Sequence, residues 1–305
     1  MPAARAIVVT AGGVMAGGVL QGLLGAGIEV AEIWSAGNLD HKTTRRLAPN
    51  WHVRALAERH GIARFSPPPL RQWDGVIDHV AGVGADLLVT ALTYQIVPAH
   101  LLLMFGTRAV NFHPALLPPY RGPTPIDAMM LDGTADEFGG VTMHRLEPRV
   151  DEGPIVGQRR VPRRGRHPQV WRAHLAEAAR QLASDELPLY LAGTIKPLQQ
   201  VGGNHANAWP SMRIGAQTAL AEAMHVVDAL GATGRVTVAA AGARIPVRNI
   251  ARVEHHHETP ARIGWREVAV NLADARVTFG RFGSWQRLTH GLISARELLA
   301  IERDR

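Results

Sequence analysis

The sequence predicts an α/β protein: an N-terminal open, mostly parallel sheet flanked by helices, followed by a small β-rich C-terminal domain. Three observations lead to this fold class. An apolar strand, a glycine turn, a helix and a second strand open the chain, in the order of a βαβ unit. Past residue 230 the chain changes to short strands separated by turn signals. The length of 305 residues corresponds to about two domains.

The apolar opening, residues 6–27, is the first element to assign. Its apolar character resembles that of a signal peptide or membrane anchor, but its seven glycines would weaken a membrane helix. We therefore expect a buried strand at 5–10, a helix at 14–24 and a second strand at 29–35. Because no other apolar stretch is long enough to span a bilayer, we expect no membrane contact.

Helices and strands continue to alternate up to about residue 200. Helices are expected at 51–60, 71–83, 99–105 and 170–187, the last ended or kinked by Pro188, and strands at 64–66, 85–91, 109–112, 141–146 and 155–161. After a Gly- and Asn-rich segment, a helix is expected at 216–230 and strands at 235–239, 243–253, 265–271 and 275–279. We therefore expect a first domain at 1–200, a linker at 201–212 and a C-terminal domain at 213–305.

The composition excludes several chemistries. The chain has no cysteine, so it has no disulfide framework, thiolate zinc site, iron–sulfur cluster or cysteine nucleophile. This absence fits a reducing compartment, and we expect a cytoplasmic location. The 33 Lys and Arg exceed the 26 Asp and Glu, which gives a net charge of +7. Such a surplus favours acidic partners, although an arginine-rich proteome would explain it equally well.

The stretch at 110–157 carries the most chemical information. Asn111 and His113 lie two residues apart at the end of an apolar strand, so both point to the same face of the sheet. The carboxyl ends of strands in an open α/β sheet are where ligands bind. Prolines at 114, 118, 119, 123 and 125 stiffen the loop that follows, which suits a preorganised site.

A carboxylate follows in the same stretch, because Asp151 precedes a turn at Gly153. An imidazole can exchange a proton near neutral pH, a carboxylate can stabilise its cation, and an amide can donate to an oxyanion. No serine or cysteine lies within 110–157 to act as a nucleophile. The residues therefore favour direct attack by a substrate, such as an amine, on an activated acyl carbon.

The two halves of this stretch resemble a known family signature. Residues 111–122 (NFHPALLPPYRG), with 140–144 (GVTMH) and 151–156 (DEGPIV), resemble the paired motifs of the 10-formyltetrahydrofolate-dependent formyltransferases. That family includes methionyl-tRNA, glycinamide ribonucleotide and sugar-nucleotide N-formyltransferases. The resemblance implies a Rossmann-like sheet of the formyltransferase fold as the catalytic domain. It also implies 10-formyltetrahydrofolate as co-substrate, with no metal and no nicotinamide.

The resemblance also assigns roles. It implies that Asn111 donates to the formyl oxygen, that His113 is the general acid/base, and that Asp151 pairs with His113 and relays the proton. It implies a folate pocket built from the loops before and after, namely Leu92, Thr93, Gln95, Ile96, Val97, Leu146, Glu147, Arg149 and Val150. Residues expected next to the substrate are Gly12, Gly13, Pro114, Tyr120, Arg121 and Gly122.

The acceptor is left open among several classes. The C-terminal domain faintly resembles that of methionyl-tRNA and sugar formyltransferases, whereas glycinamide ribonucleotide formyltransferases are shorter. Departures such as Ala115 in place of the serine of methionyl-tRNA formyltransferase favour a small amine or an amino-sugar nucleotide. The alternative is initiator tRNA. A second alternative is a formyl-folate hydrolase or a folate-binding protein.

Three weaker features have plainer explanations. The tract at 254–258 (EHHHE) has the composition of a metal site, but an exposed turn explains it better. His144 favours a structural role. The arginines at 159, 160, 163, 164 and 166 favour a solvated strand edge, with contact to a polyanion as the alternative.

Overall fold

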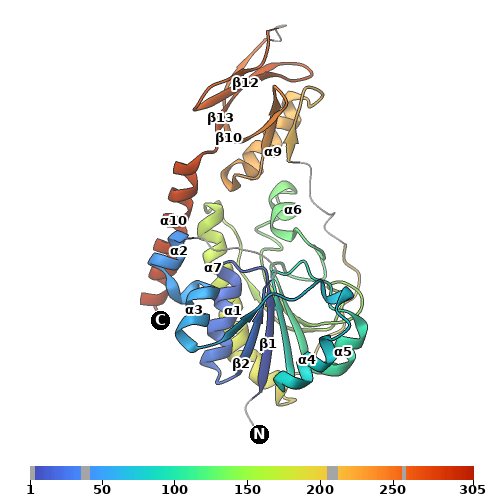
Figure 1. The fold of residues 1–305 in the computed structure, drawn as a ribbon. Helices are drawn as coiled ribbons and strands as arrows, with labels where there is room; N and C mark the ends of the chain where they lie inside the picture. Colours follow the sequence, from blue (N-terminus) through green and yellow to red (C-terminus); the bar gives the residue numbers. More distant parts are fainter. Residues whose placement is uncertain (1–3, 36–41, 205–211, 256–258) are drawn as a thin grey trace.

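The computed structural model describes residues 4–35, 42–204, 212–255 and 259–305, and these residues form two sheets at opposite ends of the molecule (Figure 1). The larger sheet has the strand order β3-β2-β1-β4-β5-β6-β7. Strands β1 to β5 are parallel, while β6 is antiparallel to both β5 and β7. The strands are β1 (Arg5–Thr10), β2 (Glu29–Trp34), β3 (Ala63–Phe65), β4 (Leu87–Ala91), β5 (Ala109–His113), β6 (Gly140–Arg145) and β7 (Ile155–Arg160). The predicted open, mostly parallel sheet is confirmed.

Helices cover both faces of this sheet. On one face α1 (Val14–Gly25) and α7 (Pro168–Gln181) share a core with Val110 and Phe112 of β5. On the other, α4 (Val76–Val83) and α5 (Ala99–Phe105) pack in a second core with Ala109. Odd-numbered residues of β5 therefore face the α4/α5 side, as strand alternation requires.

Close helix packing explains the glycines of α1. A Cβ on Gly17 would lie 2.0 Å from the Trp51 carbonyl oxygen, and one on Gly18 would lie 2.2 Å from that of Ala176 in α7. The glycines of α1 therefore allow close packing of the helix against α7 and the turn at Trp51.

The remaining elements of this part refine the predicted boundaries. The predicted helix at 71–83 is divided into a 3-10 turn and α4, and the predicted helix at 170–187 passes through a π turn into α8, with Pro188 in the first turn of α8. Pro188 therefore does not end the helical path, because the first turn of a helix needs no N–H from it. The elements are α2 (Lys42–Leu47), α3 (Val53–His60), α6 (Pro125–Leu131), α8 (Leu187–Leu191), the 3-10 turns at Pro49–Trp51, Leu70–Gln72 and Gly106–Arg108, and the π turn at Leu182–Glu186.

The smaller sheet has the order β11-β12-β13-β10-β9-β8 and confirms the predicted β-rich C-terminal part. Helix α9 (Leu220–Leu230) packs beside it, and a 3-10 turn follows at Gly231–Thr233. The expected linker at 201–212 lies mostly outside the described residues, so the domain boundaries remain expectations. The strands are β8 (Arg213–Ile214), β9 (Thr237–Ala240), β10 (Ala243–Glu254), β11 (Arg262–Ile263), β12 (Glu267–Asn271) and β13 (Arg276–Arg281).

A 20-residue helix that was not predicted from the sequence, α10 (Ser284–Arg303), follows the smaller sheet. Its apolar residues do not form one buried stripe, since Trp285, Leu288 and Leu292 are exposed. The helix runs from the smaller sheet back to α2 and α7 (Figure 1). His174 and Glu297 join α7 to α10 at 2.8 Å. No helix in the described ranges is long and apolar enough to cross a membrane.

Candidate active site

A cavity of about 300 Å³ lies where β4 and β5 end, on the α4/α5 side of the sheet. Asn111, His113 and Asp151 all line it, together with Thr90 of β4. Asn111 and His113 therefore share a face, as the two-residue spacing predicts. The loops after β4 and β6 form the walls of the cavity.

His113 is fixed by its backbone partner. It is 3% exposed, and its Nε2–H donates to the carbonyl oxygen of Tyr120 at 2.8 Å. Because a carbonyl can only accept, Nδ1 is the ring nitrogen free to gain or lose a proton, and it lies 3.4 Å from Oδ2 of Asp151. Burial lowers the pKa of His113, while the charge of Asp151 opposes that fall.

Asp151 is held ionised among several donors. Its backbone has a left-handed φ of 56°, and the amide N–H of Gly122 donates to Oδ2 at 2.8 Å. Burial raises the pKa of Asp151, but His113, His144 and the Gly122 N–H outweigh it and hold that pKa well below its usual range. The carboxylate therefore stays charged in a buried site.

Asn111 lies between two neighbouring strands. Thr90 of β4 donates its hydroxyl to Oδ1 of Asn111 at 2.7 Å, and Nδ2 of Asn111 lies 3.0 Å from Nε2 of His144 in β6 and 3.2 Å from Oδ1 of Asp151. His144 Nδ1 lies 2.9 Å from the carbonyl of Arg145, so Nδ1 carries a hydrogen that it donates to this carbonyl. These partners orient the NH₂ group of Asn111 toward the carboxylate.

Thr90 and His144 are site residues that were not predicted from the sequence. Both pair directly with Asn111 in the sheet, Thr90 from one side and His144 from the other. From the sequence we expected a structural role for His144. Its contacts with Asn111 and Asp151 make it part of the site as well. No sequence motif identifies Thr90 as a site residue, because the strand register that places it beside Asn111 is set by tertiary structure.

The expected folate-binding residues gather around the cavity with one exception. Arg149 does not line it: its side chain is 83% exposed and lies 3.5 Å from Glu152 at the surface. Tyr94, Pro148, Pro123 and Pro125 also line the cavity. The expected residues that line it are Leu92, Thr93, Gln95, Ile96, Val97, Leu146, Glu147 and Val150.

The residues expected next to the substrate divide into two groups. Pro114 and Gly122 line the cavity. Tyr120 and Arg121 brace the loop instead, since the Tyr120 hydroxyl donates to Asp132 at 2.9 Å and Arg121 donates to Gln200 at 2.9 Å. Gln200 in turn donates to the backbone oxygens of Asp151 and Gly153, at 2.9 and 2.7 Å, which fixes the loop that presents the carboxylate.

The two remaining substrate candidates, Gly12 and Gly13, lie beside the cavity wall. Both have a positive φ, and a Cβ on Gly13 would lie 3.4 Å from Cδ1 of Leu92. Neither is among the residues that line the cavity. Within the described ranges no group of three His, Asp or Glu is arranged to hold a metal ion, and residues 256–258 of the histidine tract lie outside those ranges.

Comparison with known proteins decides the family. The family model described as formyl transferase matches residues 6–164, which is more than half of the chain. The chain belongs to the formyl transferase family. It is 36% identical over 149 residues to a methionyl-tRNA formyltransferase of Streptococcus pyogenes, a match that covers 48% of this chain and 47% of that relative. The chain thus spans about half the length of the curated relatives it matches.

Solved structures extend the likeness of fold to the C-terminal part. The structure of HypX from Aquifex aeolicus in complex with tetrahydrofolic acid is similar in fold. The match covers 90% of the present chain and 43% of the HypX chain, at a TM-score of 0.58 and 15% identity. An N-formyltransferase from Helicobacter canadensis, in complex with folinic acid and dTDP-3-aminofucose, matches 92% of this chain and 100% of its own, at a TM-score of 0.56 and 12% identity. At these identities the likeness concerns the fold.

Proposed function

We propose that the protein transfers a formyl group from 10-formyltetrahydrofolate to a primary amine. The observation that carries this proposal is the convergence of Asn111, His113 and Asp151 on one cavity. An amide donor, a proton acceptor and a carboxylate are the groups that direct aminolysis of an activated formyl group requires. Membership of the formyl transferase family supports the same reaction.

The cavity suits a folate co-substrate. Its volume of about 300 Å³ is at the lower end of the range for ligand pockets, and its walls are mostly apolar. The peptide groups of residues 92–97 offer donors and acceptors to the edge of a pteridine ring, with Ile96 and Val97 packing on its face. When bound there, 10-formyltetrahydrofolate supplies the activated formyl carbon.

Residues of the chain stabilise the charges of the reaction and transfer its proton. Attack of the amine nitrogen on the formyl carbon gives a tetrahedral intermediate, whose oxyanion accepts the Nδ2–H of Asn111 that otherwise bonds Asp151 at 3.2 Å. Nδ1 of His113 takes the proton that the attacking nitrogen loses and returns it to the departing folate nitrogen. Asp151 stabilises the imidazolium in between, at 3.4 Å. In the whole reaction the formyl group moves from the folate nitrogen to the acceptor amine, and one N–H proton moves from the amine to the folate nitrogen.

We propose a small amine or an amino-sugar nucleotide as the acceptor. The departures from the methionyl-tRNA formyltransferase motifs, such as Ala115, support this choice. The full-length match in fold to the Helicobacter canadensis enzyme, which was solved with dTDP-3-aminofucose, supports it as well. The absence of cysteine fits a reducing compartment, and we propose the cytoplasm as the place of the reaction.

Initiator tRNA is the second candidate acceptor. The 36% identity to a methionyl-tRNA formyltransferase supports it. So does a row of exposed arginines on β10, namely Arg244, Arg248 and Arg252, with the exposed Trp265 nearby in sequence. Basic side chains and an exposed aromatic ring suit contact with phosphates and bases.

One experiment compares these possibilities. The protein is incubated with 10-formyltetrahydrofolate and, in separate reactions, charged initiator tRNA, a panel of amino-sugar nucleotides, a panel of small amines, or no acceptor. Formylation of an amine supports the proposal and identifies the acceptor class. Release of formate at a rate that no acceptor changes would identify a hydrolase instead, and binding without turnover would identify a folate-binding protein.

A further inference from the structure

Helix α6 lies between the active-site loop and the C-terminal part of the chain (Figure 1). Its residue Asp127 is only 1% exposed. Oδ2 of Asp127 forms an ion pair with the guanidinium of Arg235, which lies just before β9. Oδ1 has no hydrogen-bond partner within the described residues, and it faces Nη2 of Arg172 in α7 at 3.9 Å. A buried carboxylate thus joins three parts of the molecule that are distant in sequence.

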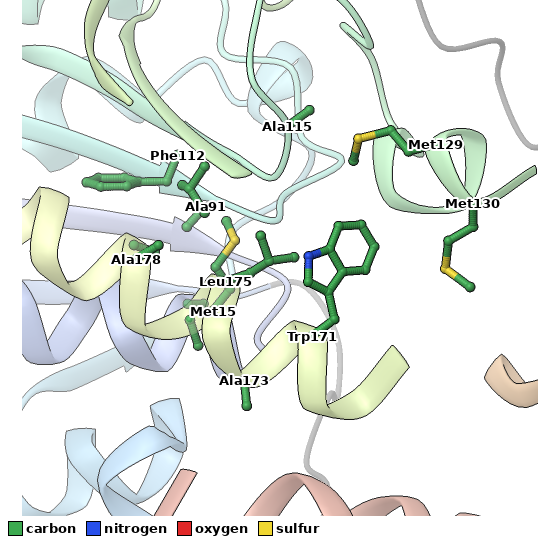
Figure 2. Packing of buried hydrophobic residues seen from close by; sticks show 14 of the residues in the cluster. Met15, Ala91, Phe112, Ala115, Met129, Met130, Trp171, Ala173, Leu175 and Ala178 are labelled. Carbon is green, nitrogen blue, oxygen red and sulfur yellow. The ribbon is translucent and has the colours of Figure 1, made fainter. Parts of the chain in front are cut away.

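Helix α6 is also fastened to the rest of the catalytic domain. Met129 and Met130 of α6 belong to the same buried cluster as Trp171 of α7, whose ring points toward α6 in Figure 2. At its other end, the Tyr120 hydroxyl donates to Asp132, the residue that caps α6, at 2.9 Å. A displacement of α6 therefore moves the loop that contains Tyr120.

This loop makes a hydrogen bond to each member of the catalytic pair. The Tyr120 carbonyl accepts from His113 at 2.8 Å, and the Gly122 N–H donates to Asp151 at 2.8 Å. Only two residues separate Gly122 from Pro125, where α6 begins. The position of α6 consequently sets both bonds.

We propose that Asp127 and Arg235 are positioning residues. Their ion pair couples the position of the C-terminal domain to the geometry of His113 and Asp151. Arg235 holds α6 from the C-terminal side, and α6 holds the loop that orients the pair. The activity arm of the test rests on the proposed formyl transfer, whereas its spectroscopic arm does not.

Arg235→Gln is the informative variant, because the Arg235 side chain is 33% exposed and its replacement need not disturb the core. We expect kcat for formyl transfer to fall about fivefold, with KM for 10-formyltetrahydrofolate changed less than about twofold. Arg235→Lys keeps the ion pair and should restore most of kcat. The control Arg213→Gln removes one exposed arginine from the same domain and should leave kcat unchanged.

The spectroscopic arm follows the Nε2–H resonance of His113 by NMR, because this proton is donated to the Tyr120 carbonyl at 2.8 Å. If Arg235→Gln loosens the loop, that hydrogen bond weakens, so the resonance moves upfield and the proton exchanges faster with solvent. The pKa of His113 does not separate the two cases, because burial lowers it and the Tyr120 carbonyl raises it, and a loosened loop changes both. Loss of a distant positive charge alone leaves the hydrogen bond in place.

The outcomes decide the proposal. An upfield, faster-exchanging Nε2–H resonance of His113 in Arg235→Gln, absent in Arg213→Gln and reversed in Arg235→Lys, supports it. An unchanged Nε2–H resonance and exchange rate in Arg235→Gln overturn it, whatever the enzyme does. If the wild-type protein forms no formylated product, the proposed function fails, while the His113 Nε2–H resonance still decides whether the coupling exists.

Discussion

Nδ1 of His113 lies 3.4 Å from Oδ2 of Asp151, inside a cavity where both side chains are almost fully buried. The Nε2 hydrogen of His113 is already donated to the Tyr120 carbonyl. A proton gained at Nδ1 therefore points at the carboxylate, and the two groups titrate as a pair. This arrangement keeps one proton available within the site.

Asp151→Asn should abolish most formyl transfer. The amide cannot stabilise the imidazolium, and we expect the rate to fall by about 10² to 10⁴. Binding of 10-formyltetrahydrofolate should persist, because the walls of the cavity are contributed by other residues. Single-turnover kinetics and calorimetric binding measure the two effects separately. The exposed Asp74→Asn is the control, and a rate for Asp151→Asn within threefold of wild type would refute the assigned role.

Thr90→Val should reduce kcat without weakening folate binding. The substitution removes the hydroxyl that donates to Oδ1 of Asn111 at 2.7 Å, so the amide is held less firmly. The loss of one such bond corresponds to about a three- to tenfold fall in kcat. Thr90→Ser retains the hydroxyl and should recover most of the activity. Steady-state kinetics test this, and equal rates for the valine and serine variants would contradict it.

Activity should persist to a lower pH than it would with a histidine of ordinary pKa. Burial lowers the pKa of His113 from 6.5, so the neutral, proton-accepting form persists below that pH. We expect the half-maximal point of kcat/KM on the acid side to lie below pH 6.5. Asp151→Asn removes the charge that favours the imidazolium, so it should lower the pKa of His113 and move the half-maximal point to a lower pH. Half-maximal activity at or above pH 6.5 in the wild type is incompatible with the idea.

Folding stability should fall as the pH drops from about 6.5 toward 4. Burial, with the charges of His167 and Arg172, lowers the pKa of His290 on α10 to about 4. Below the unfolded value of 6.5 the unfolded chain takes up a proton that the folded chain excludes, so the stability present at neutral pH is lost. Thermal unfolding between pH 7 and 4.5 measures this loss. His290→Gln should flatten the dependence, whereas the exposed His225→Gln should leave it unchanged.

Two glycines of α1 should respond in opposite directions to alanine. A Cβ on Gly18 would meet the Ala176 carbonyl oxygen at 2.2 Å, so Gly18→Ala should cost about 1–3 kcal/mol or more. A Cβ on Gly25 meets nothing within 4 Å, and Gly25→Ala should stabilise by about 0.5–1 kcal/mol through helix propensity. Urea unfolding compares the two. Equal effects would show that α1 is not packed closely on α7.

The sequence predicted the catalytic part of the fold closely, because its strands are continuous apolar runs and its helices have clear boundaries. The strand Arg5–Thr10 and the helix Ala99–Phe105 were predicted to the residue. Helix α10 was not predicted, since several of its apolar residues are exposed and they form no single buried stripe. The split between the turn at Leu70–Gln72 and α4 was also missed, because both segments have helical composition.

The sequence by itself determined the identity of Asn111, His113 and Asp151, and strand alternation determined that the first two share a face. Tertiary structure decided which groups orient them. Thr90 and His144 become neighbours of Asn111 through strand register, and Gly122 and Tyr120 hold the pair through the fold of a loop. Tertiary structure also put Arg149 in solvent, away from the cavity. Local patterns reveal which residue types are present, whereas register and loop packing depend on contacts between residues far apart in the chain.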